Sequence, residues 1–214
     1  MKYRLLGGTG ILVSEIGFGA WGIGGVTSGP TSYGNTNDKD SRRALRCALE
    51  NEINFYDTSN LYGDGHSEIL IGETFKGVRD RVIIATKAGL LKYNHPPDFS
   101  EKAIRNSLGG SLRRLQTDYI DILQYHNPPK ELFQENDTTL NLIQKLKQLF
   151  FFGKLFFLPL CQINREKWKV GEAGAICTVA DVMESSADPL QLHIDFESVI
   201  DARLLIRTEG FVLL

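Results

Sequence analysis

The chain has few cysteines, no excess of charge of either sign and no long hydrophobic run. Its three cysteines, Cys47, Cys161 and Cys177, leave one thiol unpaired in any disulfide scheme and show no C-x-x-C spacing. We therefore expect reduced, buried thiols rather than a disulfide framework. The formal net charge is −2 over 214 residues. This charge argues against a nucleic-acid partner, because such proteins gather lysine and arginine to neutralise phosphates.

Signals for membranes and secretion are also missing. The most apolar segment, 149–161, is interrupted by Gly153 and Lys154 and is shorter than the about 20 residues that span a bilayer as a helix. The N-terminus reads Met-Lys-Tyr-Arg and lacks the apolar core of a signal peptide. These features predict a cytoplasmic protein without membrane contact.

Spacing argues against two further kinds of site. His66, His95 and His193 have no metal-ligand spacing, so we expect no metal centre. The glycine-rich segments 7–10 and 22–25 do not form a G-x-G-x-x-G motif that opens a helix after a strand. We therefore expect no Rossmann dinucleotide site.

Three short apolar runs each end in a polar side chain. They are 53–56 before Asp57, 82–86 before Lys87, and 120–125 before His126. Their length and β-branched content are typical of buried strands, and helical patterns separate them, so the unit is β-α-β-α-β with parallel strands. Chemistry in such folds gathers at the carboxyl ends of strands. Tyr62, five residues past Asp57, lies in the loop over the same rim.

Together these four side chains suit one reaction. A buried Lys87 ammonium beside the Asp57 carboxylate can keep its charge, and within roughly 4–6 Å its field favours the ionised Tyr62 hydroxyl. This lowers the tyrosine pKa from about 10 toward neutrality and makes Tyr62 a usable general acid. His126 adds a donor that can orient a carbonyl oxygen. The set suits protonation of an oxygen while a hydride reaches the attached carbon.

Each side chain alone is more often structural. A single lysine at a strand end is usually solvated, a single histidine is usually hydrogen-bonded in the framework, and a loop tyrosine is usually packed. The joint placement on successive strand ends supports the functional interpretation.

Several ordered motifs within about residues 1–155 resemble the aldo-keto reductase family. They are 54–63 with Ser67, Glu68 and Gly72, then 84–87, 115–126, the opening hairpin at 5–10, and 17–21. The resemblance implies a TIM (β/α)8 barrel with an N-terminal β-hairpin. It also implies a nicotinamide cofactor, NADPH or alternatively NADH, bound without a Rossmann fold. The implied reaction is reduction of an aldehyde or ketone to an alcohol, or the reverse.

The resemblance also assigns roles by position. The implied catalytic residues are Asp57, Tyr62, Lys87 and His126. The implied cofactor-binding residues are Gly19, Ala20, Trp21 and Asp57. Tyr62 would be the general acid, Lys87 would depress its pKa, and His126 would steer the carbonyl.

Length predicts an incomplete barrel. A full barrel takes about 250 residues, and the chain has 214. We expect a first barrel strand near 16–19 and a fifth near 153–158, with helices near 41–50, from Ser67 as N-cap, from Ser100, and at 138–149. Gly109 and Gly110 would weaken or bend the third helix. We therefore expect a single domain, 1–214, with a half-barrel over 1–155 and a divergent C-terminal segment over 156–214.

The segment after Pro159 departs from the family pattern. It lacks the family's residues for the nicotinamide amide and the basic stretch for the adenosine phosphate. An open sheet edge needs a cover, so we expect either 190–196 to fold back over 150–157, or a homo-oligomer formed through that edge. Two functions stay open: a reductase acting on a small carbonyl or alcohol substrate, or a catalytically weak relative serving as a binding or scaffold protein.

Overall fold

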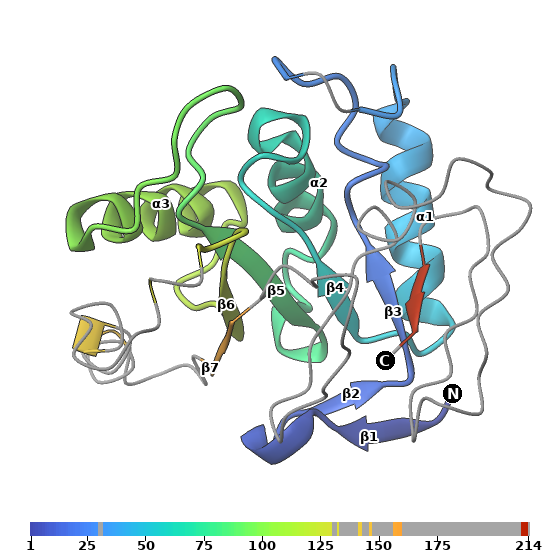
Figure 1. The fold of residues 1–214 in the computed structure, drawn as a ribbon. Coiled ribbons are helices and arrows are strands. Elements are labelled where there is room, and N and C mark those ends of the chain that lie inside the picture. Colours follow the sequence, from blue (N-terminus) through green and yellow to red (C-terminus); the bar gives the residue numbers. More distant parts are fainter. Residues whose placement is uncertain are drawn as a thin grey trace, which may run out of the picture.

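The computed structural model describes residues 1–29, 32–129, 132, 141–142, 146, 156–159 and 211–213. A hairpin of β1 (Tyr3–Leu5) and β2 (Leu12–Ser14), joined by the short 3-10 turn Gly7–Thr9, precedes a six-stranded sheet. The sheet has the order β7-β6-β5-β4-β3-β8. Its strands are β3 (Ile16–Gly19), β4 (Phe55–Asp57), β5 (Ile83–Ala88), β6 (Ile122–Tyr125), β7 (Phe156–Pro159) and β8 (Phe211–Leu213). In Figure 1 the hairpin lies across the lower end of the sheet, where β3 begins.

The strands from β3 to β7 pair in parallel and in chain order. This arrangement confirms the predicted β-α-β-α-β unit, and it is the order in which successive units of a (β/α)8 barrel lie. The first barrel strand has the predicted bounds, and the expected fifth strand is present as β7, shifted toward Pro159.

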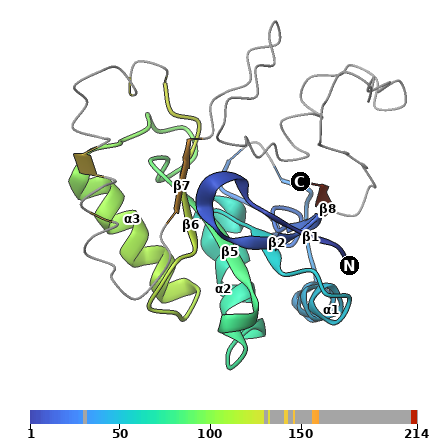
Figure 2. The same ribbon diagram turned by 90° about the horizontal axis from the view of Figure 1, so that it is seen from below.

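Three helices, α1 (Asp38–Glu50), α2 (His66–Thr74) and α3 (Glu101–Arg114), form an arc around the outside of the strands (Figure 2). The side chain of Asn37 caps α1 by accepting from the backbone of Lys39 and Asp40, so this helix begins earlier than predicted. The helix α3 begins next to Ser100 as predicted, and the Ser100 hydroxyl caps it by accepting from the Ala103 amide.

One helix prediction was wrong. Ser67 does not cap α2, because Gly65 precedes that helix with φ +96° and Ser67 lies inside it. The Ser67 hydroxyl donates to the Ala20 carbonyl at 2.7 Å instead. The helix α3 is continuous across Gly109 and Gly110, and the bend or weak point expected there stays a prediction. A Cβ on Gly110 would lie 3.1 Å from the guanidinium of Arg114, so this glycine provides room for a side chain that packs over it.

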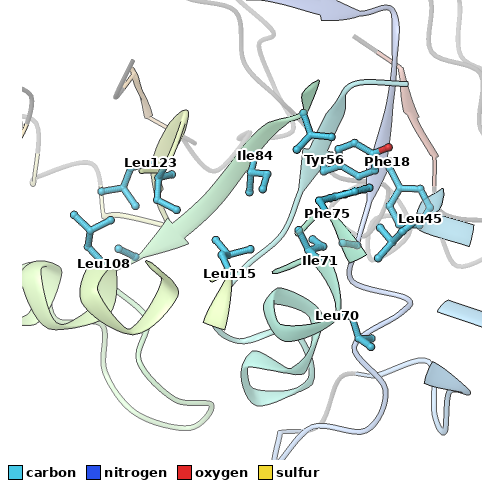
Figure 3. Close-up of a cluster of buried hydrophobic side chains, with 14 of the residues drawn as sticks. Phe18, Leu45, Tyr56, Leu70, Ile71, Phe75, Ile84, Leu108, Leu115 and Leu123 are labelled. Atoms are coloured by element: carbon cyan, nitrogen blue, oxygen red, sulfur yellow. The ribbon is translucent and has the colours of Figure 1, made fainter. Parts of the chain in front are cut away.

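Most of the core lies between the sheet and the helices (Figure 3). Tyr56, Ile84 and Leu123 face this side from neighbouring strands, and the helices add further apolar side chains. A smaller cluster on the other side joins the strands to the hairpin; it contains Leu6, Ile11, Val13, Phe55, Ala85 and Ile122. Because side chains alternate along a strand, Asp57 and Lys87 share the second face, away from the helices.

The predictions for the cysteines and for the segments 138–149 and 190–196 had different outcomes. Cys47 is exposed on α1, contrary to the expected buried thiol, because it lies outside the stripe formed by Leu45 and Ala48. Cys161 and Cys177 are outside the described residues, as are 190–196 and most of 138–149. Within the latter, Leu142 and Leu146 are helical and buried in the core.

The two edge strands of the sheet are β7 and β8. The edge strand β8 pairs antiparallel with β3. A segment near the end of the chain therefore covers the edge of β3. Among the described residues, no helix is long and apolar enough to cross a membrane.

Candidate active site

The ammonium of Lys87 is at the centre of the site predicted from the strand ends. Its Nζ donates to Oδ2 of Asp57 at 2.6 Å, to the Tyr62 hydroxyl at 3.0 Å, and to the carbonyl of Thr58 at 3.0 Å. Asp57, Lys87 and Tyr62 are nearly inaccessible, with exposed fractions of 1%, 2% and 8%. The structure thus brings these residues together at the carboxyl ends of β4 and β5, as expected.

The buried ammonium keeps its charge. Burial alone lowers the pKa of Lys87, but the Asp57 carboxylate and the Tyr62 hydroxyl beside it raise it, and the net direction is upward. The three hydrogen bonds use all three ammonium donors. Lys87 is therefore a fixed positive charge in contact with the phenol oxygen of Tyr62.

The loop that carries Tyr62 is held from two sides. The amide of Thr58 donates to the Ala85 carbonyl at 2.8 Å and ties the start of the loop to β5. After Tyr62, Gly63 adopts φ +62°, and a Cβ there would lie 2.0 Å from the Gly24 carbonyl oxygen. Only glycine allows this backbone conformation and close approach together. The tyrosine therefore precedes a turn whose conformation and packing require glycine.

His126 follows β6 and reaches the same rim. Its amide donates to the Ala88 carbonyl at 2.8 Å, and its ring lies edge-on to that of Tyr62, with centroids 6.3 Å apart. Burial, and then the charge of Lys87, lower the pKa of His126 well below its ordinary value. The imidazole is therefore neutral at physiological pH.

The predicted cofactor-binding residues lie close to the site, but they differ in exposure. Gly19 and Trp21 are partly exposed, whereas Ala20 is fully buried in the core cluster. Gly19 pairs with Asp57 across β3 and β4, and the amide of Ala20 donates to the Asp57 carbonyl at 2.8 Å. The ring of Trp21 lies 6.3 Å from that of Tyr62 and 4.7 Å from that of Tyr33. This side of the rim therefore offers a partly exposed glycine and an aromatic ring near Tyr62.

Sequence reasoning missed the polar network behind Lys87. Glu68, fully buried on α2, accepts from the Thr86 hydroxyl at 2.5 Å and from Nε of Arg114 at 2.6 Å. Thr86 directly precedes Lys87, so this network joins β5 to both α2 and α3. A glutamate within the apolar stretch of α2 was the available signal, since buried carboxylates are usually paired.

Sequence reasoning also missed Ser59, which lies two residues after Asp57. Its hydroxyl is 3.2 Å from Nδ1 of His126 and 3.1 Å from the amide nitrogen of Leu61. No pattern in the sequence distinguishes this serine from an ordinary turn residue. As for metals, the described part of the chain contains no group of three or more His, Cys, Asp or Glu side chains placed to hold an ion.

Comparison with known proteins identifies the family of the chain. Residues 15–165 match the model of the aldo/keto reductase family. The chain belongs to this family, which confirms the resemblance and the (β/α)8-barrel fold class seen in its sequence.

Individual relatives agree with this assignment. The chain is 39% identical over 171 residues to aldo-keto reductase YhdN of Bacillus subtilis (strain 168), covering 78% of this chain and 49% of the relative. The holo form of aldo-keto reductase AKR11C1 from Bacillus halodurans matches with a TM-score of 0.62 at 32% identity, over 75% of this chain and 50% of that chain. An aldo-keto reductase from Klebsiella pneumoniae in complex with NADPH matches with a TM-score of 0.56 at 27% identity, over 74% and 49%. The chain therefore spans about half the length of these relatives.

Proposed function

We propose that this chain carries the proton-transfer site of a nicotinamide-dependent carbonyl reductase. It would convert an aldehyde or ketone to an alcohol, or catalyse the reverse, with Tyr62 as the general acid. The observation that carries the proposal is the pair of contacts from the buried Lys87 ammonium, to Asp57 at 2.6 Å and to the Tyr62 hydroxyl at 3.0 Å.

Tyr62 can act as the acid because the Lys87 ammonium stabilises the phenolate that forms when the proton leaves. As Tyr62 gives its proton to the carbonyl oxygen, a phenolate forms next to the Lys87 ammonium, which is already oriented. Asp57 holds that ammonium and keeps it charged. A preorganised charge of this kind stabilises the transition state without reorganisation of solvent, and an acid titrating nearer to physiological pH transfers its proton more readily.

The rim beside Tyr62 fits a flat aromatic ring such as nicotinamide. Gly19 has no side chain and is partly exposed, and the ring of Trp21 lies on the same side. Ala20 is fully buried and would not touch the nicotinamide. A solved relative from Klebsiella pneumoniae contains NADPH, which supports NADPH as the cofactor. Bound here, the reduced nicotinamide would supply the hydride to the carbonyl carbon, while the residues of this chain would supply the proton and orient the oxygen.

The test replaces Tyr62 by phenylalanine, which removes the hydroxyl and keeps the ring. We expect Tyr62→Phe to lower kcat for carbonyl reduction by about 10²–10⁴-fold, the usual contribution of general acid catalysis. NADPH affinity, measured by fluorescence titration, should stay nearly unchanged, because the hydroxyl acts mainly in the transition state. The matched control is Tyr3→Phe on the hairpin, which should leave kcat unchanged.

Two results would overturn the proposal. One is an unchanged kcat in Tyr62→Phe. The other is the absence of NADPH binding by the wild-type chain, which would show that the site cannot be used for hydride transfer.

A further inference from the structure

Ser59 follows Asp57 by two residues and precedes Tyr62 by three. It is completely buried, with an exposed fraction of 0%. Its Oγ has three polar neighbours: the amide nitrogen of Leu61 at 3.1 Å, Nδ1 of His126 at 3.2 Å, and Oδ1 of Asn60 at 3.4 Å. Among the described residues, this hydroxyl forms a hydrogen-bond contact with the imidazole on its Nδ1 side.

The single hydrogen of the hydroxyl can go to only one acceptor. The Leu61 amide is a donor and uses a lone pair of Oγ. The hydrogen therefore goes either to His126 or to Asn60. At 3.4 Å the contact with Asn60 is beyond the about 2.5–3.0 Å typical of O–H···O bonds, and the Asn60 amide is anchored elsewhere, through Nδ2 to the Leu90 carbonyl at 2.8 Å. The shorter contact favours Nδ1 of His126 as the acceptor.

We propose that Ser59 is a positioning residue that holds His126 in the tautomer with hydrogen on Nε2. A neutral imidazole whose Nδ1 accepts a hydrogen bond must carry its hydrogen on Nε2. In this form the ring presents a donor, rather than a lone pair, to a carbonyl oxygen beside Tyr62. The catalytic consequence rests on the proposed function, but the tautomer itself does not.

Tautomer selection matters here because the imidazole is neutral. A protonated histidine carries hydrogens on both nitrogens and needs no selection. Burial and the nearby Lys87 charge disfavour that form. The neutral ring has one hydrogen, and its position decides whether Nε2 attracts or repels a carbonyl oxygen.

The direct test is nuclear magnetic resonance of protein labelled with ¹⁵N in its histidines. The ring nitrogens of His126, assigned by their loss in His126→Gln, report which nitrogen carries hydrogen. In the wild type we expect an unprotonated Nδ1 and a protonated Nε2, unchanged on either side of neutral pH. Ser59→Ala should shift both resonances toward averaged values, and Ser59→Thr, which keeps a hydroxyl, should restore the wild-type pattern.

A matched control separates this role from general packing. Ser107 is also a buried serine, on α3, with an exposed fraction of 6%, and Ser107→Ala should leave the His126 resonances in place. A hydrogen on Nδ1 in the wild type would overturn the proposal. So would a His126 pattern in Ser59→Ala that matches the wild type.

Kinetics then test the link to catalysis. Loss of a whole oriented donor lowers kcat by about 10²–10³-fold. Ser59→Ala should lower kcat for reduction by a smaller factor, with the NADPH dissociation constant unchanged. If the tautomer behaves as expected but the wild type does not turn over, the proposed function fails and the role of Ser59 in holding the tautomer stands. If turnover depends on Tyr62 but the hydrogen is on Nδ1, the role of Ser59 fails alone.

Discussion

The buried pair between Glu68 and Arg114 gives the sharpest test of what holds the site in place. Glu68 has an exposed fraction of 0%, and Nε of Arg114 approaches its Oε2 to 2.6 Å. The arginine chain passes over Gly65, where a Cβ would lie 2.7 Å from the Arg114 Cδ. The perturbation is Arg114→Met, which keeps much of the apolar length of the side chain and removes the charge.

The expected loss in the free energy of unfolding follows from the Glu68 carboxylate, which stays buried after its arginine partner is removed. Removing one partner of a buried ion pair costs about 3–5 kcal/mol. The lower end applies, because the Thr86 hydroxyl still donates to Glu68 and the Arg114 side chain is 29% exposed. A loss of about 3 kcal/mol in the free energy of unfolding lowers Tm by about 6–12 °C in a chain of this size.

Urea denaturation followed by circular dichroism measures this change. The double variant Glu68→Gln/Arg114→Met should be more stable than Arg114→Met alone, because no unpaired buried charge remains. The matched control is Arg105→Met on the same helix, which breaks an exposed pair with Glu101 and should cost less than about 1 kcal/mol. The reasoning is refuted if Arg114→Met costs no more than Arg105→Met, or if the double variant is the less stable one.

Two further predictions concern packing and pH. Gly72→Ala should destabilise the chain by about 1–3 kcal/mol in the same assay, as overpacking does, because the added Cβ would lie 2.6 Å from the backbone carbonyl oxygen of Arg114; an unchanged midpoint would contradict the close approach. If Tyr62 is the general acid, as proposed, reduction needs its protonated form, so the rate should fall as pH rises through the tyrosine pKa. In Lys87→Met that fall should move to higher pH, because the charge that favours the phenolate is gone, whereas the exposed control Lys92→Met should keep the wild-type profile.

The strand-end part of the site could be predicted because parallel strands impose it. Once the apolar runs before Asp57 and Lys87 are recognised as neighbouring parallel strands, their carboxyl ends must meet at one edge. The alternation of side chains then fixes the face. This reasoning requires no knowledge of the loops, and this is why the contact between Lys87 and Asp57 follows the expectation. Tyr62 lies in the loop after β4, and its placement was expected only because it follows Asp57 by five residues.

Contacts between distant segments could not be predicted in this way. Ser67 has the local pattern of an N-cap, yet its hydroxyl bonds to Ala20, 47 residues away, because the preceding Gly65 opens the helix. Glu68 and Arg114 are 46 residues apart. For Cys47 a local pattern was the better guide. Cysteine is usually buried, but the helical period places Cys47 outside the buried stripe of α1.

The edge of β3 offers a last test, since an open edge invites pairing with other chains. The antiparallel strand β8 covers this edge, with Val212 opposite Gly17. Proline lacks an amide hydrogen and has a fixed φ, so Val212→Pro should disrupt the pairing. The β3 amides that face β8 should then exchange with deuterium faster than in the matched control Val212→Ala, and light scattering should detect more self-association as the chain is concentrated. If these β3 amides keep their wild-type protection in Val212→Pro, the pairing with β8 does not protect the edge.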